Sequence, residues 1–308
     1  MRQSLPFIVM TLNKSYKKRN LFWIVLFLLP NTILYTMYTI YPAIQTAFSS
    51  FLDWNGFQRV GEFCGFENYV TLFHDTTFFS SLKATFGFML FVVPLRFLIS
   101  LGFALLLNWK KCKGRSFFRT LLFLPVVTTG AIIGTVMKMI FDPKYGPINI
   151  VLSSLGLMEQ SKGLLASFDT ALVTGGVIWV WKWMGMSLIY WIASLQSIPD
   201  ELYEAAKIDG ASSLQSFFSI TAPLLKQFAA IILVLTIGDS LRVFDLMLTL
   251  TNGGPFYATE TIELFIYHTA FTDRVPRLGY ASAAATIFAL FFVAVSILQS
   301  FVKKKERM

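Results

Sequence analysis

The chain has 308 residues, of which 55% are hydrophobic and only 14% are charged. Its mean hydropathy is positive, which excludes an ordinary soluble domain and indicates that a bilayer is the main solvent. The formal net charge is +9, but the basic residues are scattered among short polar segments, so a nucleic-acid partner is not expected.

Six apolar runs approach the roughly 20 residues that a helix needs to cross a hydrocarbon core. They predict an all-α membrane protein with six transmembrane helices. In chain order the predicted spans are 21–41, 79–107, 117–141, 171–195, 228–250 and 278–302. We therefore expect an N-terminal segment of residues 1–20, a transmembrane domain of residues 21–302 and a tail of residues 303–308.

Lysine and arginine are distributed unevenly among the segments between these spans. Fifteen of them lie in one set of segments, which consists of residues 1–20, 108–117, 199–226 and 303–308. Only five lie in the alternate set, which consists of residues 53–77, 142–170 and 251–277. Because cytoplasmic loops carry the excess of basic residues, both termini are predicted to be cytoplasmic.

Residues 197–225, between the fourth and fifth predicted spans, have the features of two capped helices. Pro199 suits a first helical turn, and the acidic residues that follow it favour the positive end of the helix dipole. Gly210 can close this helix in the left-handed conformation, and Ser212 with Gln215 has the spacing of a capping box for the next helix. A polar, capped loop between membrane spans is typical of a docking surface.

The sequence EAAKIDGA at residues 204–211 resembles the EAA loop of the permease subunits of binding-protein-dependent ABC importers. GFENY at 65–69, RTLLFLP at 119–125 and TNGGP at 251–255 are similar to the carbohydrate branch of that family, which includes the maltose and glycerol-phosphate permeases. The resemblance covers most of the chain and implies the type I ABC importer permease architecture.

In that family the EAA loop forms coupling helices that insert into a groove on a cytoplasmic ATPase. The resemblance implies that this contact is made here by Glu204, Ala205, Ala206, Asp209 and Gly210. It also implies a multi-pass protein of the bacterial inner membrane. The implied partners are a second, different permease subunit, two copies of the ATPase, an extracytoplasmic solute-binding protein and membrane lipid.

The sequence carries no pattern for catalysis or for a bound cofactor. It has no phosphate-binding loop, no HExxH motif, no nucleophile elbow and no credible Cys/His metal cluster. We therefore expect a subunit that is not an enzyme and that has no catalytic residue and no metal site. ATP and Mg are expected on the partner ATPase.

Charged side chains inside spans are costly unless they are paired or face water. Asp239, Arg242 and Asp245 are three residues apart and are expected to share one helical face. Arg96 is hypothesised to pair with an acid of the cavity or of the partner permease. Aromatic faces stack on sugar rings, so two tryptophans of the fourth span join the candidates. The candidates for the substrate path are Trp179, Lys182, Trp183, Asp239, Arg242 and Asp245. A structural ion network and an interfacial aromatic belt remain the alternatives.

Two sequence features concern helix packing and the outer surface. Gly130 and Gly134 form a GxxxG pattern, which allows close helix approach in lipid. TNGGP has the composition of a rigid turn. In the resembled family this region faces the binding protein, which implies that role for Gly253, Gly254 and Pro255; a turn that only reverses the chain is the alternative.

Taken with the resemblance, the sequence indicates the transmembrane subunit of an ATP-driven carbohydrate importer that works by alternating access. One alternative is an ABC permease for a non-sugar solute such as glycerol phosphate. Another is an ion-coupled secondary transporter, which the lack of an evident inverted repeat disfavours. A scaffold or receptor is disfavoured by the charges inside the spans.

Overall fold

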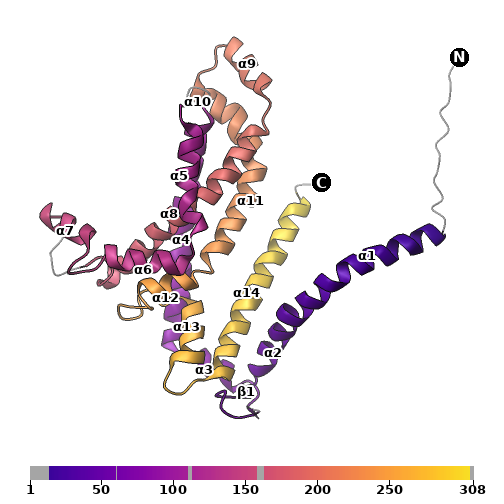
Figure 1. The fold of residues 1–308 in the computed structure, drawn as a ribbon, viewed down its shortest axis with the longest axis vertical. Coiled ribbons are helices and arrows are strands. Elements are labelled where there is room, and N and C mark those ends of the chain that lie inside the picture. The colour runs from indigo at the N-terminus through magenta and orange to yellow at the C-terminus, as the bar shows by residue number, and fades with distance from the viewer. Residues whose placement is uncertain (1–13, 60, 110–112, 158–162, 306–308) are drawn as a thin grey trace. The chain divides into compact units, whose positions relative to one another are not determined.

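The computed structural model describes residues 14–59, 61–109, 113–157 and 163–305 (Figure 1). Residues 1–13 of the predicted N-terminal segment and 306–308 of the predicted tail lie outside the described residues. The described part is almost wholly helical, and its only strands, β1 (Leu52–Asp53) and β2 (Glu62–Phe63), pair antiparallel. The chain divides into two units, Met1–Asn68 with Leu278–Met308, and Tyr69–Arg277.

The first unit joins the two ends of the chain. Helix α1 (Lys14–Tyr35), the π-helical turn η1 (Thr36–Ile40) and α2 (Tyr41–Ser49) follow one another without a break. Helix α14 (Leu278–Lys305) packs against α2 and β1. The contact is fixed by hydrogen bonds, because Gly279 donates its N–H to the Trp54 carbonyl at 3.0 Å. The Asn68 side chain also joins this region, donating to the carbonyls of Ser50 and Leu52 at 2.9 Å each.

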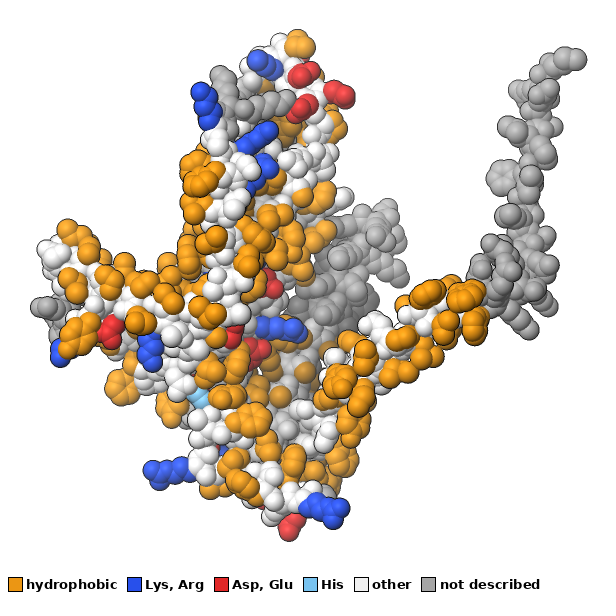
Figure 2. All heavy atoms as spheres, viewed as in Figure 1, with side chains coloured by type: hydrophobic (Ala, Val, Ile, Leu, Met, Phe, Trp, Pro, Cys, Tyr) orange, Lys and Arg blue, Asp and Glu red, His pale blue; other side chains and the backbone are white. Residues whose placement is uncertain are grey.

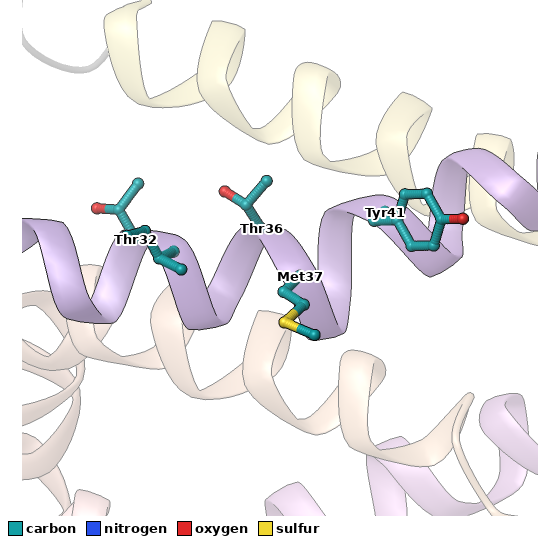
Figure 3. Close-up of a pocket in the computed structure, with 5 residues that line it drawn as sticks. Thr32, Thr36, Met37 and Tyr41 are labelled. Atoms are coloured by element: carbon teal, nitrogen blue, oxygen red, sulfur yellow. The ribbon is translucent and has the colours of Figure 1, made fainter.

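Over residues 21–49, the continuous stretch of α1, η1 and α2 leaves nearly all of its apolar side chains uncovered by the rest of the described chain. Its apolar part covers residues 21–49 and is long enough to cross a membrane. A shallow hollow on this stretch is lined by Thr32, Ile33, Thr36, Met37 and Tyr41 (Figure 3). Such a surface suits contact with lipid or with another apolar helix.

The second unit is built around two long helices that pack along much of their length. These are α4 (Thr76–Asn108) and α8 (Phe168–Gln196), with α5 (Arg115–Val127) and α11 (Ala222–Ser240) beside them. Asp75 caps α4 by accepting the N–H groups of Thr77 and Phe78. One apolar cluster surrounds Trp179, and a second surrounds Trp191 on the same helix. α8 is therefore the central helix of this unit.

The predicted third span is two helices and not one. Helix α5 ends at Val127 and α6 (Gly130–Ile140) leaves it at an angle of 98°. Thr128 and Thr129 between them are extended, and the Thr129 hydroxyl caps α6 by accepting the Ile132 N–H. The span predicted over 117–141 is therefore broken into two helices, because this polar pair stops one helix and starts another.

The predicted fifth span begins earlier and ends earlier than expected. Helix α10 (Ser213–Ser216), η2 (Phe217–Thr221) and α11 together cover residues 213–240. Residues 241–243 are not helical, and α12 (Phe244–Leu250) is a separate helix. Leu241 and Val243 are both buried, which fixes the link in this non-helical path. The expectation that Asp239, Arg242 and Asp245 share one helical face is therefore wrong.

Four helical stretches of the described chain are long and apolar enough to cross a membrane, or five if the bent pair counts as one span. They are residues 21–49, 76–108, 168–196 and 213–240, with 115–140 as the bent pair. Helix α14 is apolar over residues 278–294. The prediction of an all-α membrane protein is confirmed, and the six-span count is consistent with these helices.

The shorter helices complete the second unit. They are α7 (Pro147–Ser154), α9 (Asp200–Ile208), α13 (Ile262–Tyr267) and the π-helical η3 (His268–Thr272), while α3 (Glu67–Leu72) lies at the boundary of the two units. Helix α6 packs against α12, and both glycines of the GxxxG pattern face α12. A Cβ atom on Gly134 would lie against the Thr249 hydroxyl and 2.9 Å from the Leu246 carbonyl oxygen.

Replacing Gly134 with alanine is expected to separate α6 from α12. The added methyl has no room, and overpacking of this kind destabilises by about 1–3 kcal/mol. The matched control is Gly102→Ala in α4, where a Cβ would meet no heavy atom within 4 Å. Thermal unfolding of the detergent-purified protein should show a lower midpoint for Gly134→Ala and an unchanged or higher one for Gly102→Ala. Equal midpoints would contradict the packing described.

Candidate coupling loop and translocation path

The loop between α8 and α11 is the helix–turn–helix that its sequence predicts. Helix α9 is followed by Gly210, whose φ of +79° closes the turn. The predicted capping box is present, because the Ser212 N–H donates to Gln215 Oε1 at 2.8 Å and the Gln215 N–H donates to Ser212 Oγ at 3.3 Å. Local sequence alone therefore determines the shape of this loop.

The loop presents a free surface at one end of the second unit. Four of the five predicted contact residues are exposed and Ala206 is half-buried. Charged side chains gather on α9, whose sequence is DELYEAAKI, and Figure 2 shows red and blue together at that end of the second unit. Ile208, at the end of α9, is 86% exposed. The loop is also attached to the helices behind it, because the hydroxyls of Tyr203 and Thr221 lie 2.9 Å apart.

A buried arginine joins three of the long helices. Arg96 of α4 is 1% exposed; its Nε donates to Ser187 Oγ of α8 at 2.9 Å, and a terminal nitrogen lies 3.1 Å from Asp239 Oδ2 of α11. The Asp239 side chain is 45% exposed. Arg96 was hypothesised to pair with an acid of the cavity or of the partner permease. In the structure it pairs with Asp239, an acid of its own chain.

The three candidates on α8 lie on the same side of that helix. Trp179 and Lys182 are buried, and Trp183 is half-buried. Lys182 Nζ donates to the Thr128 carbonyl at 2.8 Å and lies 4.2 Å from the centre of the Trp183 ring. The indole N–H groups of both tryptophans are buried, and neither has an acceptor among the described residues. This face therefore holds two buried indole donors without a partner in the described part of the chain.

The other three candidates are distributed on both sides of the end of α11. Asp239 is in its last turn, Arg242 is in the non-helical link and Asp245 is in the first turn of α12; all three are exposed. The Asp245 carboxylate packs against Gly130 of α6 and accepts the Leu246 N–H at 2.9 Å. The structure therefore brings Asp239 to Arg96, while Asp245 lies at the break between α5 and α6.

Sequence reasoning did not single out Glu263, which lies in α13 near this link. Its burial raises the pKa of the carboxyl to about 7; the charge of Arg242 opposes this rise and that of Asp245 adds to it. The position of this acid within an apolar hexapeptide, IELFIY, was the available signal.

The TNGGP turn is held by side chains that follow it. Thr259 Oγ1 donates to the Gly254 carbonyl at 2.8 Å, and the Gly254–Pro255 peptide is cis. His268 Nδ1 lies 2.8 Å from Glu260 Oε1, and its Nε2 lies 3.2 Å from Asn252 Oδ1. Burial raises the pKa of the Glu260 carboxyl, and the hydrogen bond with His268 opposes that rise.

The turn also displays two aromatic side chains. Phe256 is 87% exposed and Tyr257 is 62% exposed, directly after the cis proline. The sequence did not predict that Glu260 and His268 hold the turn, because these residues are separated from the turn and from each other along the chain. In the described part of the chain, no group of three or more His, Cys, Asp or Glu side chains is placed to hold a metal ion.

Residues 97–308 match the family described as "Binding-protein-dependent transport system inner membrane component". The match covers more than half of the chain, and the chain belongs to this family. It is therefore a non-catalytic membrane component of an ABC transporter that depends on a binding protein.

Several named permeases are similar to this chain over nearly their whole length. The "Probable ABC transporter permease protein YurN" of Bacillus subtilis is 34% identical, with 89% of this chain and 93% of the relative covered. The "Multiple sugar-binding transport system permease protein MsmF" of Streptococcus mutans is 32% identical, covering 96% and 99%. The "sn-glycerol-3-phosphate transport system permease protein UgpA" of Agrobacterium fabrum is 30% identical, covering 90% and 93%.

A solved structure has the same fold. It is a chain of a bacterial ABC transporter involved in the import of the acidic polysaccharide alginate, with a TM-score of 0.79 at 24% identity. The likeness covers 95% of this chain and 99% of that chain. The type I permease architecture implied by the sequence resemblance is thereby supported at the level of the whole fold.

Replacing Arg96 with methionine is expected to lower the stability of the second unit. The change leaves Ser187 and Asp239 without their common donor, and the loss of a charged hydrogen bond of this kind costs about 1–3 kcal/mol. The matched control is Lys226→Met on the exposed surface of α11. Thermal unfolding in detergent should show a clearly lower midpoint for Arg96→Met alone, and equal midpoints would refute a structural role for the ion pair.

Glu263 should make stability depend on pH. The pKa of Glu263 is about 7 in the folded protein and 4.5 ordinarily, so the folded state binds more protons than the unfolded state between these pH values. The free energy of unfolding therefore falls as the pH rises from 4.5 through 7. Glu263→Gln is therefore expected to raise the unfolding midpoint at pH 8 and to change it little at pH 4.5. Glu62→Gln, at an exposed position of β2, serves as control. A gain of the same size at both pH values would show that burial does not shift this carboxyl.

Proposed function

We propose that this chain is the transmembrane subunit through which an ATP-driven importer moves a carbohydrate, delivered by an extracytoplasmic binding protein. The observation that carries the mechanism is the exposed, capped helix–turn–helix between two long apolar helices. The carbohydrate class is supported by the names of relatives such as the multiple sugar permease, and by the alginate importer that shares the fold.

The coupling contact is proposed for the α9 loop. Glu204, Ala205, Ala206, Asp209 and Gly210 would meet a groove on one ATPase subunit, and ATP and Mg would be bound by the two copies of that ATPase. The support is the exposure of this surface, its mixture of charges and the small side chains of the two alanines, which permit close backbone approach. A second, homologous permease would complete the pair, and both termini would lie in the cytoplasm, including residues 1–20 and 303–308.

The solute path is proposed to run beside the polar cluster of α8, α11 and α12. Asp239, Arg242 and Asp245 are exposed and can exchange hydrogen bonds with sugar hydroxyls. The half-buried Trp183 supplies aromatic surface, and the buried Trp179 and Lys182 pack against it. At the outer end, Gly253, Gly254 and Pro255 would face the binding protein, with Phe256 and Tyr257 as the exposed contacts.

A glycerol-phosphate importer is the second candidate, because one relative of 30% identity is a permease for that solute. An ion-coupled secondary transporter is disfavoured by membership of a binding-protein-dependent family. Calorimetry on the cognate binding protein separates the two solute classes, since a phosphorylated polyol and a neutral sugar would compete unequally for its site.

The test is ATP-dependent uptake in vesicles that contain both permeases and the ATPase, with loaded binding protein outside. Uptake should require ATP and persist when ionophores collapse ion gradients. Gly210→Val should lower uptake about tenfold, because the left-handed conformation costs a residue with a Cβ about 1–2 kcal/mol and 1.4 kcal/mol is a factor of ten.

Gly210→Asn is the matched control, since asparagine tolerates the left-handed conformation and no atom lies within 4 Å of a Cβ at this position. It should retain most of the uptake and the binding-protein-stimulated ATPase activity. Uptake that continues without ATP, or that is lost with the ion gradient, would reject the importer mechanism. Normal ATP-driven uptake by Gly210→Val would reject the coupling role of the turn alone.

A further inference from the structure

The break between α5 and α6 creates two helix ends that face each other within the second unit. The helices meet at 98°, with Thr128 and Thr129 between them. A helix carries partial negative charge at its C-terminus and partial positive charge at its N-terminus. The Thr129 hydroxyl already accepts one N–H of α6. Away from water, the other unpaired groups at the two ends need partners from elsewhere in the protein.

Lys182 supplies a cation at the end of α5. Its Nζ donates to the carbonyl of Thr128, the residue that caps α5, at 2.8 Å. The side chain is 2% exposed and its ammonium also lies over the Trp183 ring. The sign of the charge complements the carbonyl end of the helix, and the hydrogen bond satisfies a group that α5 itself leaves free.

Asp245 supplies an anion at the start of α6. A Cβ placed on Gly130, the first residue of α6, would be 2.6 Å from the carboxylate carbon of Asp245, so the carboxylate lies directly against this helix end. The sign again complements the helix. The charge of Asp245 also acts on Lys182, which connects the two ends electrostatically. Arg96 and Asp239 already pair with each other.

We propose that Lys182 and Asp245 form a clasp that sets the angle of the broken α5–α6 segment and acts as a pair of positioning residues for transport. Lys182 projects from α8 and Asp245 from α12, so the clasp ties the end of α5 to α8 and the start of α6 to α12. This positioning role of Lys182 and Asp245 would be the same for any transported solute. It also gives Lys182 a role that needs no contact with the solute.

The direct test measures the angle of the broken segment. Spin labels are attached to cysteines at positions 118 on α5 and 139 on α6, which are both exposed, in a background where Cys64 and Cys112 are serine. Lys182→Met and Asp245→Asn are each expected to broaden the distance distribution between the labels. Lys138→Met, an exposed lysine on the same segment, is the matched control and should leave the distribution unchanged.

The functional readout is uptake in reconstituted vesicles. Each single variant should lower the maximal rate about tenfold, while the half-saturating concentration of loaded binding protein stays the same. Because both residues act on one break, the double variant should lose less than the product of the two single losses. Lys182→Arg, which keeps the charge and the donor, should recover most of the rate.

Three results would overturn the proposal. They are an unchanged distance distribution in Asp245→Asn, strictly multiplicative losses in the double variant, or a raised half-saturating concentration with unchanged distances, which would instead make Lys182 a solute contact. Asp245 is exposed, so its variant is expected to assemble and decides the outcome even if Lys182→Met does not fold. The distance measurement needs no solute, so failure of the carbohydrate assignment leaves it interpretable.

Discussion

The guanidinium of Arg96 constrains how the central helices of the second unit can be arranged. A buried arginine has several N–H donors in a fixed plane, and leaving them unpaired in an apolar interior is very costly. Here Ser187 of α8 and Asp239 of α11 accept from it. Any sliding of α4 against these two helices would break a charged hydrogen bond, so Arg96 helps to hold α4, α8 and α11 in one register, together with the apolar packing between them.

The loop proposed for coupling, residues 197–225, connects two of these helices, α8 and α11. α8 carries Ser187 and Lys182 and leads, past Gln196, to α9; η2 and α11 follow on the other side of the loop and end near Asp239. The hydroxyls of Tyr203 and Thr221 connect the two sides at the loop itself. If an ATPase binds α9 as proposed, a displacement of α9 would reach both helices that contact Arg96, because the loop is joined to each of them.

Local signals in the sequence were sufficient for the loop and for the membrane class. The Ser212–Gln215 box and the left-handed Gly210 are set by neighbours within a few residues, and apolar composition is enough to indicate spans. The two interruptions were missed because a hydropathy run continues through Thr128 and through Leu241. Arg96 could be marked as needing an acid, but the choice of Asp239 depends on packing between residues 143 positions apart.

Charged residues lie beside both helix interruptions, the one at 128–129 and the one at 241–243. These residues have two separate roles in the second unit. The buried cations, Arg96 and Lys182, are committed to a carboxylate and to a helix end within the chain. Asp239 pairs with Arg96, and Asp245 lies against Gly130 at the start of α6; both carboxylates remain exposed. A hydrogen-bonding solute on the proposed path would therefore meet one carboxylate, that of Asp239, which a buried cation holds in place. If the proposed clasp operates, the angle of the broken α5–α6 segment and the geometry of the proposed path depend on the same charged side chains.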